Sequence, residues 1–167
     1  MSTTSEKTSE LQIIVDAINL FQQDITHDNQ EEMIDKYVEL VNPNGKGSPF
    51  GSPNKDQETD IYEGGEMTWS ISTLGKDEDA KEGEASYLAY LECMEQEIAP
   101  GKSKGFFAEG NPINVNEKNQ IVGHVLTDDT IKDGASEKYV LRFHITKGEE
   151  FKFPMTIDPK LLIKKKI

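Results

Sequence analysis

Tyr-Val-Leu-Arg-Phe-His-Ile, residues 139–145, alternates apolar with mainly polar side chains. In an extended chain alternate side chains share a face, so this segment has one continuous apolar face. That face consists of Tyr139, Leu141, Phe143 and Ile145. The same period recurs in residues 66–72, where Met67, Trp69 and Ile71 alternate with Thr and Ser, and the only tryptophan of the chain falls on the apolar side. Both segments predict strands of a sheet with one buried face.

The length and composition indicate one folded domain. A chain of 167 residues is long enough to bury a core without disulfide bonds. Hydrophobic residues make up 35% and charged residues 29%, which is typical of a domain with long solvated loops. Residues 1–9 are rich in Ser, Thr, Glu and Lys, so we expect a flexible N-terminal segment followed by a single β-sandwich domain over residues 10–167.

The charge balance argues against two classes of partner. With a net charge of −13 and a pI of about 4.6, the surface repels phosphate backbones and anionic lipids, so neither nucleic acid nor membrane is an expected partner. Residues 1–10 lack the basic region of a signal peptide, and no apolar stretch is long enough to cross a bilayer. Because Cys93 is the only cysteine, no intrachain disulfide can form, and a cytoplasmic location fits best.

Two segments allow both a helix and a strand. The apolar residues of Leu11–Ile25 have helical spacing, with Ser9 as an N-cap, although the β-branched residues 13–15 suit a strand. Periodicity favours the helix there. Glu31–Val41 also has helical spacing, but Lys36–Val41 alternates equally well as a strand.

The remaining pattern is one of short strands and turns. Asn42–Asp60 is rich in Pro, Gly, Asn and Ser and predicts a long loop, and Gly64-Gly65 predicts a turn. Tyr87–Met94 is apolar on both faces, which is typical of a central strand covered on each side. Further strands are expected at residues 121–126, 151–153, 155–157 and 161–163, with a hairpin at 147–149 and Pro154 at an edge or bulge. Since no helices alternate with these strands, we predict an antiparallel β-sandwich with long loops and at most one or two short helices.

Two acidic segments are candidates for calcium binding, since Ca²⁺ takes several oxygen ligands. The first lies in the loop after Leu74 and contains Asp77, Glu78, Asp79, Glu82 and Glu84. Lys81 occupies the third ligand position of a calcium-binding loop, so a solvated loop is the favoured interpretation. The same holds for Asp128-Asp129.

The histidines do not form a metal-binding pattern, because His27, His124 and His144 are scattered and no two have the spacing that places both rings on one element. His144 lies opposite the core face of its strand and is most simply a surface residue. His124 and His144 would approach each other only if their strands pair, which the sequence leaves open.

Other short motifs also favour structural roles. Pro100–Ser103 is similar to the end of a phosphate-binding loop, but Gln96 stands where the first glycine belongs. Cys93 lies in an apolar strand and is expected to be buried and inert, Trp69 is expected in the core and not as a carbohydrate platform, and Lys164–Lys166 is too short for a membrane anchor. We therefore predict no catalytic, cofactor-binding or metal-binding residue, no cofactor, and no enzymatic activity.

Four segments, taken in order, resemble a known family. They are Ile13–Asn19, Lys36–Val41, Gly65–Trp69 and Phe153–Pro159. An Ile/Val-rich strand, a Tyr-containing strand before a loop, a turn leading to Trp, and a closing Asp-Pro element are similar to the AidA/PixA inclusion-body protein family. The chain departs from that pattern at Glu66, Thr68 and Ile157.

This resemblance implies a β-sandwich in which residues 11–17 form a strand and a helix occurs only near Gln30–Lys36. It brings no catalytic residue, and it implies a non-enzymatic accumulation or interaction protein inside the cell. Possible self-association would use exposed strand edges or apolar patches. The alternative is a sandwich that binds a small ligand or carbohydrate through the Asn42–Asp60 loop, with the acidic loops as candidate Ca²⁺ ligands.

Overall fold

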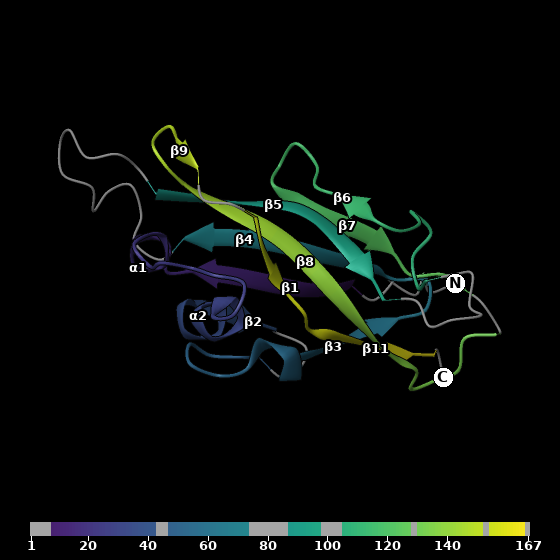
Figure 1. Cartoon of the computed structure of the whole chain (residues 1–167). Helices are drawn as coiled ribbons and strands as arrows, with labels where there is room; N and C mark the ends of the chain where they lie inside the picture. The colour runs from purple at the N-terminus through teal and green to yellow at the C-terminus, as the bar shows by residue number, and fades with distance from the viewer. Residues whose placement is uncertain are drawn as a thin grey trace.

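The computed structural model describes residues 8–42, 47–73, 87–97, 105–127, 130–151 and 154–165, which form two packed sheets (Figure 1). The first sheet has the order β2 (Val38–Val41), β1 (Thr8–Val15), β4 (Glu66–Thr73), β7 (Gln120–His124). The second has the order β3 (Glu58–Tyr62), β11 (Lys160–Lys164), β8 (Ser136–Lys147), β5 (Tyr87–Gln96), β6 (Ile113–Asn114), and β9 (Glu150–Phe151) and β10 (Met155–Ile157) also pair with β8. The predicted mainly β sandwich is confirmed.

The sandwich is mixed and not antiparallel throughout, because two strand pairs are parallel. β1 runs parallel to β4, with Leu11 opposite Trp69, and β11 runs parallel to β3, with Ile163 opposite Ile61. Parallel neighbours need a crossover connection, and between β1 and β4 the chain passes through two helices, β2 and β3. Short strands in the sequence do not reveal such a crossover.

β8 is the longest described strand and pairs along both of its edges. β5 lies antiparallel on one edge, from Tyr87 opposite Lys147 to Gln96 opposite Tyr139. Along the other edge the chain returns in three pieces, β9, β10 and β11. The expected hairpin is confirmed, with Gly148 at a φ of 60° in the turn.

The segment Leu11–Ile25, for which the sequence allowed a helix or a strand, contains one of each. The helical interpretation is wrong over Thr8–Val15, which forms β1 between β2 and β4, and the helix α1 covers only Ala17–Phe21. Pairing on both edges outweighs the local helical spacing. Asp16 caps α1 by accepting a hydrogen bond from the Asn19 N–H, whereas Ser9 is buried in β1 and donates its hydroxyl to the Asp60 carbonyl at 2.7 Å. The folded domain thus includes Thr8 and Ser9, ahead of the expected boundary at residue 10.

The segment Glu31–Val41, which also allowed both structures, forms a helix followed by a strand, since α2 (Gln30–Tyr37) leads directly into β2.

The loop expected over Asn42–Asp60 is shorter than predicted. It contains a 3₁₀ turn, η1 (Asn54–Asp56), and β3 begins at Glu58. The sequence Glu-Thr-Asp-Ile-Tyr hides this strand because its inward residues are Thr59 and Ile61, of which only one is apolar.

β5 is covered on one face only, which corrects the prediction of a strand covered on both. Its outward residues Leu88 and Tyr90 are 38% and 37% exposed. A bulge at Glu92 shifts the register, so that Ala89, Leu91 and Met94 all face the core.

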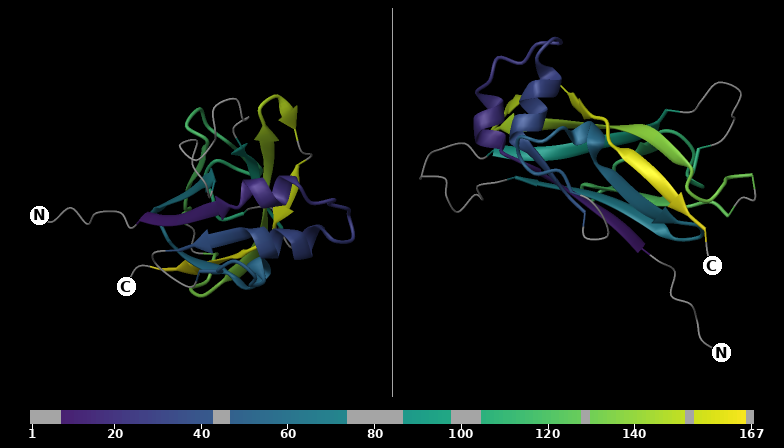
Figure 2. Two further views of the ribbon diagram at one scale, coloured as in Figure 1. Left: turned by 90° about the vertical axis from the view of Figure 1, so that its left-hand side faces the viewer. Right: turned by 90° about the horizontal axis from the view of Figure 1, so that it is seen from below.

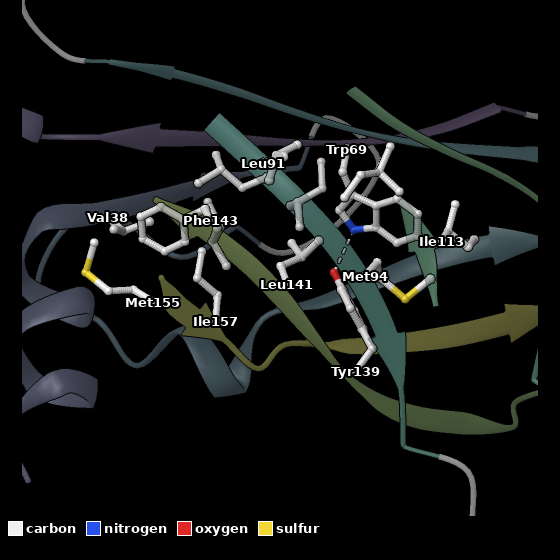
Figure 3. Packing of buried hydrophobic residues seen from close by; sticks show 14 of the residues in the cluster. Val38, Trp69, Leu91, Met94, Ile113, Tyr139, Leu141, Phe143, Met155 and Ile157 are labelled. Carbon is white, nitrogen blue, oxygen red and sulfur yellow. Dashed lines mark hydrogen bonds between the residues drawn. The ribbon is translucent and has the colours of Figure 1, made fainter. Parts of the chain in front are cut away.

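The core lies between the sheets and includes the faces predicted from the sequence (Figure 3). Tyr139, Leu141, Phe143, Ile145 and Trp69 are all fully buried, which confirms Trp69 as a core residue. The Trp69 indole N–H donates to the Tyr139 hydroxyl at 3.0 Å, and their rings meet edge to face. Burial raises the pKa of Tyr139 strongly and the hydrogen bond from Trp69 opposes this only in part, so the hydroxyl stays neutral.

Both helices lie at the same end of the sandwich, away from the end where β1 begins and β11 finishes (Figures 1 and 2). α2 contacts β10 and β2, and α1 contacts β5 and β8. This arrangement sets a polar helix beside the outer side of β8 and β10.

Candidate functional site

A cleft of about 250 Å³ opens between α2, the η1 turn and the outer side of β8 and β10. Its walls carry four carboxylates, from Glu31, Asp35, Glu97 and Asp158. The remaining lining residues are His27, Gln30, Ile34, Asn54, Val140, Thr156 and Ile157. We take this acidic hollow as the candidate site.

Local hydrogen bonds hold the walls of the cleft together. Asp35 Oδ1 accepts from the Asn54 backbone N–H at 2.9 Å, which ties α2 to η1. Gln30 Oε1 accepts from the Thr156 backbone N–H at 3.2 Å, which ties α2 to β10. These contacts join three segments far apart in the sequence, α2, η1 and β10, so the cleft exists only in the folded domain.

The two central carboxyl groups are both strained electrostatically. Burial raises the pKa of Asp35, and the nearby carboxylates of Glu31 and Asp158 raise it further against the lowering effect of the Asn54 N–H. Burial also raises the pKa of Asp158, with Glu31 adding to the effect. Since the folded state disfavours the ionised form of each group, both cost stability at neutral pH. A cationic neighbour would relieve that cost.

Asn54 is the one lining side chain with an unsatisfied polar atom. It is 1% exposed, and its Oδ1 accepts from the Ser48 hydroxyl at 3.1 Å. Its Nδ2 has no hydrogen-bond partner although it is buried. Orphaned buried donors are rare and costly, but because this atom is almost completely inaccessible to solvent, no ligand atom in the cleft can reach it.

The sequence did not single out this cleft. Glu31 and Asp35 lie one helical turn apart on α2, where like charges repel, and that spacing is the one local signal that could have been noticed. Asp158 and Glu97 follow strands in distant parts of the chain. The predicted ligand loop contributes Asn54, but the acidic segments 77–84 and Asp128-Asp129, like Pro100–Ser103, lie outside the described residues.

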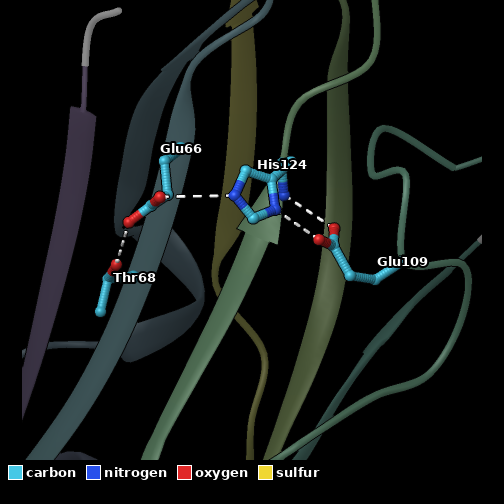
Figure 4. Close-up of polar contacts among 4 residues, drawn as sticks. All are labelled: Glu66, Thr68, Glu109 and His124. Carbon is cyan, nitrogen blue, oxygen red and sulfur yellow. Dashed lines mark hydrogen bonds and ion pairs between the residues drawn. The ribbon is translucent and has the colours of Figure 1, made fainter.

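His124 forms a separate polar cluster at the end of β7 (Figure 4). Its Nδ1 lies 2.5 Å from Glu109 Oε2, its backbone N–H donates to Glu109 Oε1 at 2.7 Å, and its Nε2 lies 3.4 Å from Glu66 Oε2. The His124 side chain is 55% exposed, so the cluster holds an exposed loop and does not enclose a ligand.

His144 belongs to the other sheet and has its own partners. It lies half-buried on β8, 2.9 Å from Glu92 and stacked on Tyr90. The contact between His124 and His144 that the sequence left open is therefore absent from the strand pairing. Across the described ranges, no group of three or more His, Cys, Asp or Glu side chains is placed to hold a metal ion.

Replacing Glu109 by glutamine is expected to lower stability by about 0.2–1 kcal/mol at neutral pH and by less in acid. Burial alone would raise the pKa of Glu109, but hydrogen bonds from the His124 side chain and N–H outweigh it and lower the pKa below its ordinary value. The stabilisation is therefore present above the unfolded-state pKa and is lost as the pH falls through the lowered value. Urea unfolding of both proteins between pH 7 and pH 3 measures it, and a difference that is constant with pH contradicts the expectation.

The other predicted features have structural roles. Cys93 is half-buried, less buried than expected, and burial followed by the Glu95 charge raises the pKa of its thiol, which disfavours the reactive thiolate. Gly64 forms the predicted turn with a φ of 75°, and Lys165 lies 3.5 Å from Glu63.

The fold is similar to that of a solved protein described as an inclusion body protein, PixA, from Burkholderia cenocepacia J2315. The likeness covers 96% of this chain and 97% of that one, with a TM-score of 0.58 and 11% sequence identity. No protein-family model matches the sequence, and no curated protein does. The resemblance read from the four sequence segments is thus confirmed at the level of the fold. Within the described ranges, no helix is long and apolar enough to span a membrane.

Proposed function

We propose that this chain is a non-enzymatic protein of the AidA/PixA type that accumulates in the cytoplasm by associating with copies of itself. The observation that carries the proposal is the fold likeness to the PixA inclusion body protein over nearly the whole length of both chains. The four sequence segments that resemble the family support it independently, since they lie in or beside β1, β2, β4 and β10.

The strand edges at β2, β7 and β5 are poor candidates for the contact between copies. The edge of β2 is bridged by Ser48 at Leu40, and a bridge between Phe107 and Val125 covers the end of β7. On β5, the Asn119 side chain accepts from the Leu91 N–H at 2.9 Å and donates to the Ala89 carbonyl at 3.0 Å. The Asn119 amide takes the hydrogen bonds that a neighbouring strand would make, so a strand of another copy cannot pair with β5 there.

The outer face of β5 is a better candidate. Leu88 and Tyr90 are two of the four large apolar side chains exposed in the described part of the chain, and they are neighbours on one face of one strand. Tyr90 also stacks on His144 of β8 at a centroid distance of 5.2 Å, which holds the ring in place. A rigid aromatic ring loses little entropy when a partner covers it.

The high negative charge opposes association and gives a way to test the proposal. At neutral pH copies carrying −13 repel one another, so we expect the mean particle mass to rise with protein concentration and with salt. Light scattering from micromolar to millimolar protein, at low and high salt, measures this. The double variant Leu88→Lys/Tyr90→Lys should shift the midpoint concentration at least tenfold upward.

The matched control adds two lysines at exposed neutral positions on the other sheet, as Gln12→Lys/Ser72→Lys, and so changes the net charge by the same two units. If this control shifts association as much as the β5 variant, the β5 face is not the contact. A protein that stays monomeric over the whole concentration range contradicts the proposed function itself.

A further inference from the structure

We propose that two copies of this chain pair through the outer face of β5 and β8 about a two-fold axis, so that Arg142 of each copy binds the partner's Glu95. This inference rests on the proposed function, since it names the charged groups through which the copies associate. Three features of the face support it: an unpaired guanidinium, an unpaired carboxylate and an exposed aromatic ring beside them.

Both charged residues lie on the same outer face. β5 and β8 are antiparallel neighbours and run side by side across the front of the molecule (Figure 1). The sequence neighbours of Arg142 on β8 are both buried, so Arg142 points outward, and it is exposed. The same burial pattern turns Glu95 outward on β5. Arg142 lies opposite Cys93 and Glu95 lies opposite Val140, so the two charged residues are diagonal neighbours.

The two charges do not neutralise each other within one copy. Diagonal positions on antiparallel strands lie about 7–8 Å apart. Among the described residues, neither Arg142 nor Glu95 forms an ion pair, whereas Glu92 on the same face lies 2.9 Å from His144. Arg142 is the only arginine of the chain, and a guanidinium can bind both oxygens of one carboxylate. The face thus presents one strong donor and one acceptor that do not meet in the single copy.

A two-fold axis satisfies both groups at once. In a two-fold contact, a residue that meets a second residue of the partner is itself met by its own copy of that second residue in return. Placing Arg142 on the partner's Glu95 therefore creates two ion pairs. An unrelated acidic partner would satisfy Arg142 but would be repelled by Glu95. This charge complementarity is the reason to infer a second copy as the occupant of the face.

The apolar residues of the face lie beside these charges. Leu88 and Tyr90 are exposed on the same side of β5, and Tyr90 stacks on His144. Ion pairs open to solvent contribute little, but pairs shielded by neighbouring side chains determine which surfaces fit together. Tyr and Arg are also the residues that most often dominate the binding energy of an interface.

Cys93 lies where the axis would pass. It is opposite Arg142 in the strand pairing and two residues before Glu95 on β5. Burial and then the charge of Glu95 raise the pKa of the Cys93 thiol, while the charge of Arg142 lowers it, so both groups lie near the sulfur. An axis that exchanges Arg142 with Glu95 runs between them, and it therefore brings the Cys93 thiols of the two copies close together.

Charge reversal tests the reciprocal pairing. In light scattering, Arg142→Glu and Glu95→Arg should each raise the midpoint concentration of association at least tenfold, because each sets like charges against one another. The double variant Arg142→Glu/Glu95→Arg should return to within about threefold of the unchanged protein, since both pairs form again in reversed order. An equimolar mixture of the two single variants should associate equally well, because every charge then meets its opposite.

Matched controls change the net charge by the same two units elsewhere, as Lys132→Glu in the loop before β8 and Glu10→Arg on β1. These should leave the midpoint unchanged, and melting temperatures confirm that each variant is folded. Controls that shift the midpoint as much as the reversals overturn the pairing, and so does a double variant or a mixture that fails to restore association. In those cases the proposed self-association still stands, whereas an unchanged protein that stays monomeric overturns both.

A thiol crosslinker gives a second measurement on the unchanged chain. Because Cys93 is the only cysteine, a short bismaleimide forms a covalent dimer only where two copies of Cys93 approach each other. We expect that dimer above the association midpoint and at least tenfold less of it with Arg142→Glu. Association without a crosslinked dimer overturns the two-fold pairing if a monofunctional maleimide adds to Cys93; if it does not add, the mixture of single variants decides.

Discussion

Replacing Trp69 by alanine is expected to lower the free energy of unfolding by about 3–5 kcal/mol, a large part of the stability of a domain of this size. The indole is fully buried between the sheets and touches the Phe107 and Tyr139 rings at centroid distances of 5.6 Å. Its removal leaves a cavity and strips the Tyr139 hydroxyl of its donor. Urea unfolding followed by circular dichroism measures the loss.

A second variant separates the hydrogen bond from the packing. Tyr139→Phe keeps the ring but leaves the buried Trp69 N–H without an acceptor, which should cost about 1–3 kcal/mol. Trp69→Ala must therefore be the more destabilising change. Equal losses would mean that the packing of the indole contributes little to stability, which contradicts its complete burial between the sheets.

Replacing Gly123 by valine is expected to destabilise the protein by about 1–3 kcal/mol through overpacking. A Cβ on Gly123 would stand 2.7 Å from Phe107 Cδ1 and 3.1 Å from Ile113 Cδ1. Phe107 cannot swing away easily, because it is 3% exposed and lies edge-on against Trp69. The glycine is required here by close packing of side chains.

A double-mutant cycle tests that explanation. Gly123→Ala and Phe107→Leu each have a cost, but together they should recover at least 0.5 kcal/mol relative to the sum, since the smaller leucine makes room for the added methyl. Additive losses in urea unfolding would mean that Phe107 is not the obstacle. The variant Gly134→Ala offers a contrast, because nothing lies within 4 Å of its Cβ and its strain comes from a φ of 82° alone.

The period of two in the sequence predicted the buried faces well. The alternation in residues 139–145 and 66–72 depends only on which side chains are apolar, and both faces lie in the core except for Ile71, which is partly buried at its margin. Turn chemistry at Gly64 and Gly148 was equally local, and both glycines have positive φ. Features that short-range chemistry decides are the ones the sequence shows.

Features that depend on distant partners were missed. β1 has helical spacing, yet it is a strand because β2 and β4 take up its backbone hydrogen-bonding groups on both sides. The sequence pattern placed β3 in a predicted loop because the strand contains few apolar residues. The outward face of β5 was misassigned, since Leu88 and Tyr90 are as apolar as their inward neighbours.

The cleft could not be predicted for the same reason. Asp35, Asn54 and Asp158 are separated along the chain, and none belongs to a short motif. Only the docking of α2 beside η1 and β10 brings them together, and the Asn54 N–H donates to Asp35 and the Thr156 N–H to Gln30 at these two contacts. When each residue of a site comes from a different segment, the sequence contains no characteristic spacing between them that could predict the site.

The parallel pairing of β3 with β11 delays completion of the second sheet during synthesis on the ribosome. β3 has no described neighbour in its own sheet other than β11, whose residue Lys160 lies opposite Glu58. Nearly all of the chain must emerge before that pair closes, so the second sheet completes after translation of its last strand. Until then, each nascent chain exposes the unpaired β3 and the apolar surface of an incomplete sheet. Nascent chains on one polysome are close together, so contacts between incompletely folded copies are most frequent there.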